Sequence, residues 1–297
     1  MTSLIRLVLG KMSEDCLTAR LRASTPFGWI KSVLKHTLLK TGSVQRVLWG
    51  PCRGMRYRIF PGYGHAYLYG GWERKCMRVI SKYIKPGSTA YDLGANYGMY
   101  TLLLARLVGP SGRVYAFEPD TEVLSNLNEQ LFLNWLRMVK TIPLAVSDKS
   151  GLALFDRSRS RATGHLLPER VAGSQSVFQV RTTTLDTFVF EDGNSPPTFV
   201  KIDIEGSESA ALRGATRVIS QYRPTFIIEL HNPSEDRAVG AILKRFGYLT
   251  FQVESGRLIK NMESGWPDRS GMWGTVLALP SSTANVCVTR AEQLNCA

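Results

Sequence analysis

The chain has 297 residues, of which 44% are hydrophobic, and it is long enough to bury a sizeable core. Its apolar runs are shorter than the about 20 residues that cross a bilayer, so we expect neither a membrane-spanning nor a secreted protein. The five cysteines form no Cys-x-x-Cys pair, which argues against a zinc or redox site and favours reduced thiols in a cytoplasm.

The formal net charge of +13 is concentrated near the N-terminus, because residues 1–60 contain eleven Lys or Arg against Glu14 and Asp15. Apolar residues recur there at helical spacing, at Ile30, Val33, Leu34 and Leu38. This pattern predicts a short basic amphipathic helix. Two interpretations stay open: the helix packs on the rest of the protein, or residues 1–60 contact an anionic partner or the inner surface of a membrane peripherally.

Beyond this extension, helical segments alternate with short apolar runs, which favours parallel strands joined by crossover helices. The expected elements are helix 74–84, strand 89–93, helix 98–108, strand 113–118, helix 121–133, strands 139–146, 177–184 and 198–203, helix 207–220, strand 225–231 and helix 235–246. The runs 248–254 and 272–279 are expected to close the sheet as an antiparallel pair. The predicted fold is therefore a doubly wound, Rossmann-like α/β domain with a mostly parallel sheet.

We divide the chain into three parts. Residues 1–69 form the basic extension, which ends in a strand and turn segment where apolar and basic residues alternate at 55–59. Residues 70–280 form the α/β domain, and residues 281–297 form a polar tail.

Acidic residues stand where predicted strands give way to loops: Asp92, Glu118, Asp203 and Glu205. In a doubly wound sheet the carboxyl ends of the parallel strands share one edge, so these carboxylates are expected to converge on one crevice. An acidic crevice in a basic protein suits a ligand with positive charge. S-adenosylmethionine carries both an ammonium and a sulfonium group.

The competing ligand is a dinucleotide, whose pyrophosphate requires a Gly-x-Gly-x-x-Gly turn. The spacing here is instead Gly94-x-x-x-Gly98, preceded by Asp92, whose carboxylate would repel a diphosphate. We expect Asp92 to address the donor's ammonium, Glu118 to accept hydrogen bonds from the ribose hydroxyls, and Asp203 to hold the methionine end. The backbone of the turn would contact the donor at Gly94, Ala95, Asn96 and Gly98.

Several motifs, in this order, resemble the FkbM family of methyltransferases. They are residues 92–98 (Asp-Leu-Gly-Ala-Asn-Tyr-Gly), 117–119 (Phe-Glu-Pro), 184–186 (Thr-Leu-Asp), 200–208 (Val-Lys-Ile-Asp-Ile-Glu-Gly-Ser-Glu) and 212–215 (Leu-Arg-Gly-Ala). The resemblance covers roughly residues 70–280. It implies a class I methyltransferase fold, S-adenosylmethionine as the cofactor, and O-methylation of hydroxyl groups on sugars, polyketides and related small molecules or glycans.

Methylation of an alcohol needs a base or a metal ion, because a hydroxyl holds its proton tightly at neutral pH. Alternation along a strand places Glu229 and His231 on one side, and likewise Asp203 and Glu205. We predict His231 as the base, with Glu229 assisting and Glu205 as the alternative; a structural His231 bonded to Glu229 is the competing interpretation. No dense metal motif is present, so no metal is predicted, although Asp203, Glu229 and His231 are the set that would hold one.

Two other function classes remain as alternatives. The basic charge favours a nucleic-acid methyltransferase, but no motif for a flipped base or for RNA binding accompanies it. A non-catalytic donor-binding scaffold is the other, and the intact donor motifs argue against it. The acceptor is not determined, and His165 in the polar stretch 156–176 is either a contact for it or a solvated loop residue.

Overall fold

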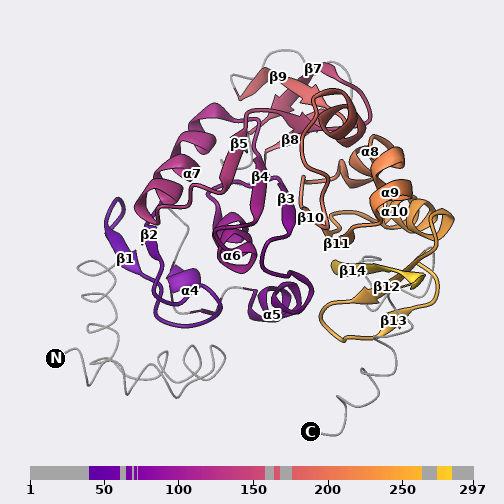
Figure 1. Cartoon of the computed structure of the whole chain (residues 1–297). Coiled ribbons are helices and arrows are strands. Elements are labelled where there is room, and N and C mark those ends of the chain that lie inside the picture. Colours follow the sequence, from indigo (N-terminus) through magenta and orange to yellow (C-terminus); the bar gives the residue numbers. More distant parts are fainter. Residues whose placement is uncertain are drawn as a thin grey trace, which may run out of the picture. The chain divides into compact units, whose positions relative to one another are not determined.

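The computed structural model describes residues 40–60, 65–68, 70–71, 73–157, 164–167, 176–262 and 273–282 (Figure 1). The predicted amphipathic helix at 30–38 lies outside them. The chain divides into two compact units, Met1–Arg74 and Lys75–Ala297. Over the described residues, no helix combines the length and apolar character that spanning a membrane requires.

The first unit contains a small hairpin. Strand β1 (Val44–Arg46) pairs antiparallel with β2 (Arg56–Arg58), and the short helix α4 (His65–Leu68) follows. Tyr57 is fully buried in β2 whereas its neighbour Arg56 is exposed. The strand and turn predicted from the alternation at 55–59 are therefore confirmed.

The second unit is built on a sheet with the order β13-β12-β14-β11-β10-β3-β4-β5. Its strands are β3 (Thr89–Leu93), β4 (Arg113–Phe117), β5 (Val139–Ile142), β10 (Phe199–Ile202), β11 (Thr225–Glu229), β12 (Tyr248–Gln252), β13 (Leu258–Ile259) and β14 (Thr275–Pro280). The run from β5 to β11 is parallel, and β14 is antiparallel to β11 and β12. This confirms a Rossmann-like, mostly parallel α/β sheet with an antiparallel closing strand.

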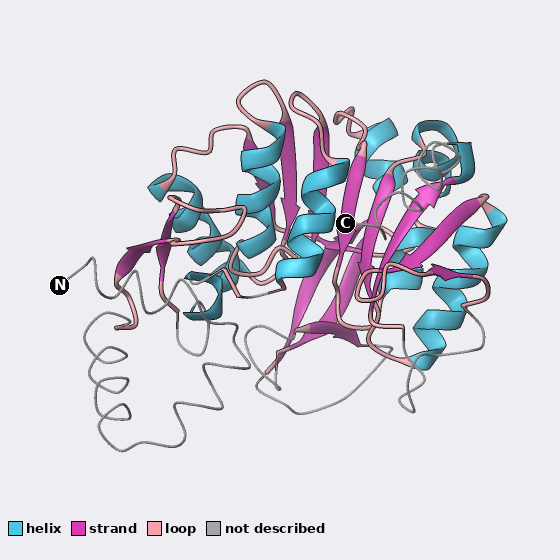
Figure 2. Ribbon diagram, turned by 90° about the horizontal axis from the view of Figure 1, so that it is seen from below, coloured by secondary structure: helices cyan, strands magenta, loops and turns pink. Residues whose placement is uncertain are grey.

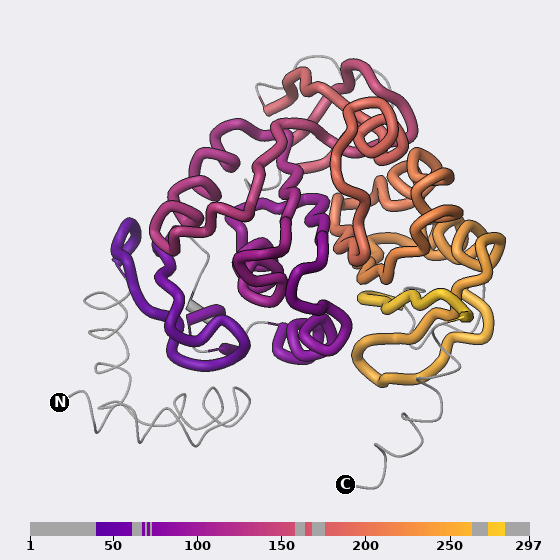
Figure 3. Tube along the Cα trace, viewed as in Figure 1, coloured from indigo at the N-terminus to yellow at the C-terminus, as the bar shows by residue number. Residues whose placement is uncertain are grey.

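The strand order reverses between β3 and β10, which lie side by side although more than 100 residues separate them (Figure 3). Ligands of doubly wound sheets bind at the carboxyl ends of the strands where the order reverses. This point of the sheet is where the motifs at 92–98 and 200–208 meet.

Helices cover both faces of this sheet (Figure 2). They are α5 (Arg74–Tyr83), α6 (Met99–Val108), α7 (Thr121–Leu133), α8 (Glu208–Arg213), α9 (Thr216–Tyr222) and α10 (Pro233–Arg245). Because both faces are covered, the central strands are buried on both sides, and all four residues of β10 are buried, including Lys201. Aromatic rings add to the core: Phe188 makes edge-on contacts with Tyr91, Tyr115 and Phe117.

A second sheet with the order β6-β9-β7-β8 was not expected from the sequence. It contains β6 (Ala145–Val146), β7 (Gly151–Asp156), β8 (His165–Leu167) and β9 (Val177–Thr183). The single strand predicted at 139–146 is wrong, because it splits between the two sheets as β5 and β6, with Pro143 between them. Proline supplies no amide hydrogen to a sheet.

The continuous helix predicted at 207–220 is also wrong. It is divided at Gly214, where a Cβ atom would lie 2.1 Å from the carbonyl oxygen of Ser147. The second part, α9, is capped from outside its own segment, because the carboxylate of Asp186 accepts the amide hydrogens of Arg217 and Val218. The Thr-Leu-Asp motif at 184–186 thus stabilises a helix start. The π-helical turn η1 (Thr187–Glu191) follows it.

Candidate active site

The turn after β3 is held against its neighbours by backbone contacts. The amides of Gly94 and Ala95 both donate to the carbonyl of Phe117, at 3.1 and 2.9 Å, which ties the turn to the end of β4. Gly94 has φ +77°, and a Cβ atom there would lie 1.9 Å from the carbonyl oxygen of Asp203. Gly98, with φ +87°, begins α6 against Leu127. Only glycine allows these close approaches.

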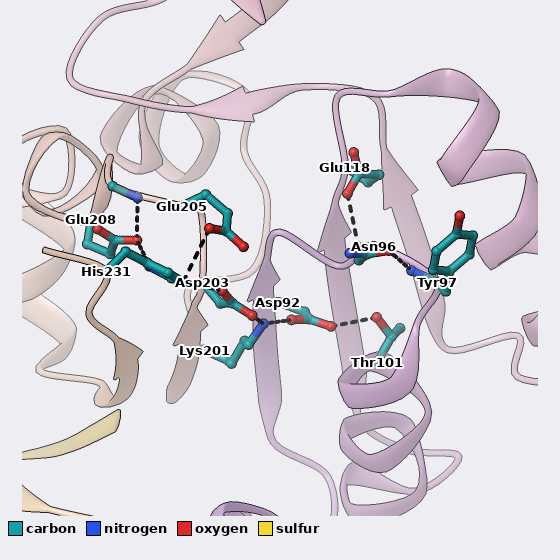
Figure 4. A network of polar contacts seen from close by, with 11 residues as sticks. Asp92, Asn96, Tyr97, Thr101, Glu118, Lys201, Asp203, Glu205, Glu208 and His231 are labelled. Carbon is teal, nitrogen blue, oxygen red and sulfur yellow. Dashed lines mark hydrogen bonds and ion pairs between the residues drawn. The ribbon is translucent and has the colours of Figure 1, made fainter. Parts of the chain in front are cut away.

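Asp92 lies beneath this turn and is fully buried. Its Oδ2 accepts a hydrogen bond from Thr101 at 2.6 Å, and Oδ1 lies 3.8 Å from Nζ of Lys201 (Figure 4). Burial raises the pKa of Asp92 above its usual range, although Lys201 and Thr101 oppose this. The contacts connect β3 with the first turn of α6, so Asp92 positions the turn from below.

Glu118 stands at the end of β4 and is oriented by two backbone amides. Its Oε2 accepts from Asn96 at 3.0 Å and its Oε1 from Asp120 at 2.9 Å. Burial raises its pKa to about 7, against the lowering effect of these two hydrogen bonds. Each oxygen of a carboxylate can accept a second hydrogen bond, so the group retains capacity for two ligand hydroxyls.

A cleft runs from Glu118 to the end of β10. The second sheet contributes to its wall, and Arg157 at the end of β7 pairs with Asp120 at 3.1 Å, next to Glu118. The cleft is lined by Gly94, Asn96, Phe117, Glu118, Pro119, Asp120, Leu144, Ala145, Val146, Phe155, Gly164, Leu166, Asp203, Ile204, Glu205 and Ser207. Apolar side chains and the backbone thus form a slot with carboxylates at both ends.

At the far end of the cleft, three carboxylates surround His231. Its Nδ1 lies 2.9 Å from Oε1 of the buried Glu208, and its Nε2 lies 3.4 Å from Asp203 Oδ1 and 3.6 Å from Glu205 Oε2 (Figure 4). Lys201, which is itself buried, bonds the other oxygen of Asp203 at 2.8 Å. A continuous polar network therefore connects α6, β3, β10, α8 and the end of β11.

Charge and burial act in opposite directions on the bases of this network. Burial would lower the pKa of His231, but the hydrogen bond and charge of Glu208, with Asp203 and Glu205, raise it to about 9. Burial likewise opposes the charge of Lys201, and Asp203 and Asp92 raise its pKa above the ordinary value. Burial raises the pKa of Glu205. The neighbouring carboxylates therefore favour the protonated form of both bases.

The predicted site residues fall into two groups. Gly94, Ala95, Asn96, Gly98 and Glu118 meet around one turn, and Asp203, Glu205 and His231 form the cluster at the other end of the cleft. The expected contact of His231 with Glu229 is wrong: its partner is Glu208, because His231 lies beyond the end of β11, where strand alternation no longer applies. Glu229 is the last residue of β11 and pairs with Thr275 of β14, and its charge acts on Lys201.

Three polar residues of the network were not assigned a site role from the sequence: Thr101, Lys201 and Glu208. Lys201 could have been found, because it is two residues before Asp203 and so shares its side of the strand. Glu208 was visible only as a member of the 200–208 motif. Its contact with His231 joins residues 23 positions apart and has no local signal.

The strand order, the glycine turn and the carboxylate at the end of β4 all indicate the same class of protein. The chain is an S-adenosylmethionine-dependent methyltransferase with the class I fold. Residues 92–252, which are more than half of the chain, match the family model described as the methyltransferase FkbM domain. The protein therefore belongs to the FkbM family of methyltransferases.

Individual relatives are distant. The chain is 27% identical over 175 residues to the hexuronic acid methyltransferase AglP of Haloferax volcanii, covering 58% of this chain and 67% of that protein. It is 35% identical over 82 residues to a protein-L-isoaspartate O-methyltransferase of Aeropyrum pernix, covering 27% and 31%. A crystal structure of an FkbM methyltransferase from Methylobacillus flagellatus KT aligns with 21% identity and a TM-score of 0.43, covering 71% of this chain and 53% of that one.

Proposed function

We propose that this protein transfers the methyl group of S-adenosylmethionine to a hydroxyl oxygen of a sugar, glycan or related secondary metabolite. The observation that carries the proposal is the cleft itself. One end holds Glu118, and the other end holds Asp203 and Glu205 beside His231. A donor site and an acid–base cluster thus open into the same slot. The similarity to a hexuronic acid methyltransferase favours an acidic sugar as the acceptor.

The donor is expected to lie along this cleft. Glu118 accepts hydrogen bonds from the two ribose hydroxyls, and the adenine lies between the apolar walls near Ala145 and Phe155. The methionine carboxylate meets the turn at Gly94–Gly98 and the start of α6, where helix amides favour an anion. The ammonium and sulfonium then face the acidic end of the cleft. Asp92 lies beneath the turn and supports it through its contacts with Thr101 and Lys201.

The reaction is an in-line displacement. The acceptor oxygen forms a bond to the methyl carbon while the carbon–sulfur bond breaks, and its electron pair stays on sulfur. The hydroxyl proton must leave as the oxygen attacks, and we assign its acceptance to Glu205, because Glu205 lines the cleft. His231 and Glu208 position this carboxylate. Alignment and exclusion of water supply the rest of the rate.

An assay with methyl-labelled donor tests the proposal. Oligosaccharides that end in a hexuronic acid are the acceptors, and the same oligosaccharides with the carboxylate reduced to an alcohol are the matched controls. Transfer to a hydroxyl gives an ether that survives alkali, whereas transfer to a carboxylate gives an ester that alkali releases as methanol. We expect an alkali-stable product.

Variants test the residue assignment in the same assay. Glu205→Gln is expected to lower kcat by roughly 10²–10⁴ while the affinity for S-adenosylhomocysteine stays unchanged. Glu191→Gln is the control, because this carboxylate is 63% exposed and pairs with Arg217 on the surface. An alkali-labile product would refute the hydroxyl acceptor, and methylation of RNA but of no saccharide would refute the sugar or glycan as the acceptor class. Normal turnover in Glu205→Gln would refute the role of Glu205.

A further inference from the structure

His231 is held on one side and directed at two carboxylates on the other. Its Nδ1 contacts Glu208, while Nε2 faces Asp203 and Glu205 (Figure 4). In metal sites a carboxylate on one ring nitrogen orients the imidazole and fixes its tautomer, so that the other nitrogen is presented to the ion. The contacts of His231 have this pattern.

The three side chains offer ligand atoms at the spacing that one ion requires. One atom from each of Asp203, Glu205 and His231 lies within 4.8 Å of the others. Ligands placed about 2.1 Å from a single ion are about 3 to 4 Å apart, so small side-chain rotations close the site. Asp203 is already oriented, since Lys201 holds its Oδ2 at 2.8 Å and leaves Oδ1 toward His231.

Glu208 lies in the protein interior, on the Nδ1 side of His231. It is fully buried, and its Oε1 also accepts the amide hydrogen of Gly206 at 3.0 Å. Its Oε2 is buried and has no hydrogen-bond partner among the residues that the structure describes. Burying a carboxylate in this way is costly unless nearby positive charge compensates it. The protonated ring of His231 supplies part of this charge, and a metal ion bound at Nε2 would replace the proton that the ring then loses.

Glu205, one of the three residues of this cluster, has a strained backbone conformation. Glu205 has φ +56°, in the left-handed region, which is unfavourable for a residue other than glycine. Gly206 follows with φ +100°, and its amide is the one bonded to Glu208. The strained turn at Glu205 and Gly206 therefore places the carboxylate of Glu205 in the cluster, and its Gly206 amide orients the carboxylate of Glu208. Strain of this kind is retained where it serves a site.

We propose that Asp203, Glu205 and His231 bind one divalent cation, with Glu208 as the positioning residue of His231. A set of two carboxylates and one imidazole suits Mn²⁺ or a similar ion. The set differs from the one considered from spacing, since Glu205 takes the place of Glu229. Sequence spacing alone does not predict an ion here.

The consequence for the acceptor rests on the proposed function. Asp203 and Glu205 line the cleft, so the bound ion would take the acceptor hydroxyl as a ligand and lower its pKa. Glu205, binding the ion through one oxygen, keeps the second oxygen to receive the hydroxyl proton. A hydroxyl with a neighbouring oxygen ligand, as in a hexuronic acid or a vicinal diol, would bind best because it can chelate.

Titration with MnCl₂ tests the site without donor or acceptor. The whole protein is stripped with a chelator and dialysed, and the electron paramagnetic resonance signal of free Mn²⁺ is followed. We expect one Mn²⁺ per chain. Glu205→Gln and His231→Gln should each weaken binding at least tenfold, and Glu208→Gln about 10- to 100-fold with S-adenosylhomocysteine affinity unchanged. Glu191→Gln should bind as the wild type does.

The outcomes separate this inference from the proposed function. If the wild type binds no Mn²⁺, or if Glu205→Gln binds it equally well, the metal site is wrong, whether or not the protein binds S-adenosylhomocysteine. If Mn²⁺ binds as expected but S-adenosylhomocysteine does not, the metal site stands and the proposed function fails. The wild-type titration alone can refute the inference, so the test holds even if a variant does not fold.

Discussion

Ionisation of Glu118 is expected to control the affinity for the donor. Burial raises the pKa of this group to about 7, and only the carboxylate form can accept hydrogen bonds from both ribose hydroxyls. With this pKa about one tenth of the groups are ionised at pH 6 and about nine tenths at pH 8. The affinity for S-adenosylhomocysteine should therefore rise about tenfold over this range, which is about 1.4 kcal/mol.

The same group predicts the opposite trend for the ligand-free protein. Its folded pKa lies above the ordinary value of 4.5, so between these values the folded state binds more protons than the unfolded state. The contribution of Glu118 to stability is complete below about pH 4.5 and is lost as the pH rises through about 7. Donor affinity should thus increase over the pH range in which this contribution disappears.

Calorimetric titration with S-adenosylhomocysteine at pH 6, 7 and 8 measures the first trend, and thermal unfolding without ligand measures the second. Glu118→Gln is the control, because it keeps the shape of the side chain but cannot ionise. Subtracting its pH profile removes the titration of other groups, including the amino group of the ligand. A wild-type affinity that does not change with pH, or an equal slope in Glu118→Gln, would refute the role given to Glu118.

Two further predictions concern the support of the donor turn. Gly94→Ala should abolish S-adenosylhomocysteine binding in calorimetry, because the added Cβ atom would lie 1.9 Å from the carbonyl oxygen of Asp203. The control is Gly109→Ala, which is also at positive φ but has open space around it and should bind normally. Thr101→Val should lower the free energy of unfolding, measured in urea, by about 1–3 kcal/mol, because it leaves the buried carboxylate of Asp92 without its hydroxyl donor. The control is Thr198→Val, which loses an exposed hydrogen bond and should lower this free energy less.

The geometry of the glycine turn was predictable from the sequence because its signals are local. Gly94 and Gly98 stand at positions where the backbone must be left-handed and close to its neighbours, and only glycine meets both demands. Glu118 follows an apolar strand, and parallel strands bring their carboxyl ends to one edge. These constraints are contained in residue type and spacing, so the turn and the position of Glu118 could be predicted without coordinates.

The positions where helices and strands are interrupted were harder to predict from the sequence. Gly214 looks like an ordinary helix residue until the carbonyl of Ser147 is known to lie against it. Asp186, within a recognisable motif, gave no sign that it caps a helix 30 residues later. Such contacts depend on how two distant segments approach, and periodicity within one segment contains no information about the other.

Periodicity and spacing therefore accounted for the alternation of helices and strands, the sheet class and the donor turn. The partners of His231 and the position of Asp92 came only from folding. Glu208 reaches His231 because α8 starts directly beyond β10 and returns its first turn to the end of β11. Asp92 is buried beneath the turn because Lys201 from the adjacent strand supplies its counter-charge. Both arrangements join residues from segments that are separate in the chain, and packing alone brings them together.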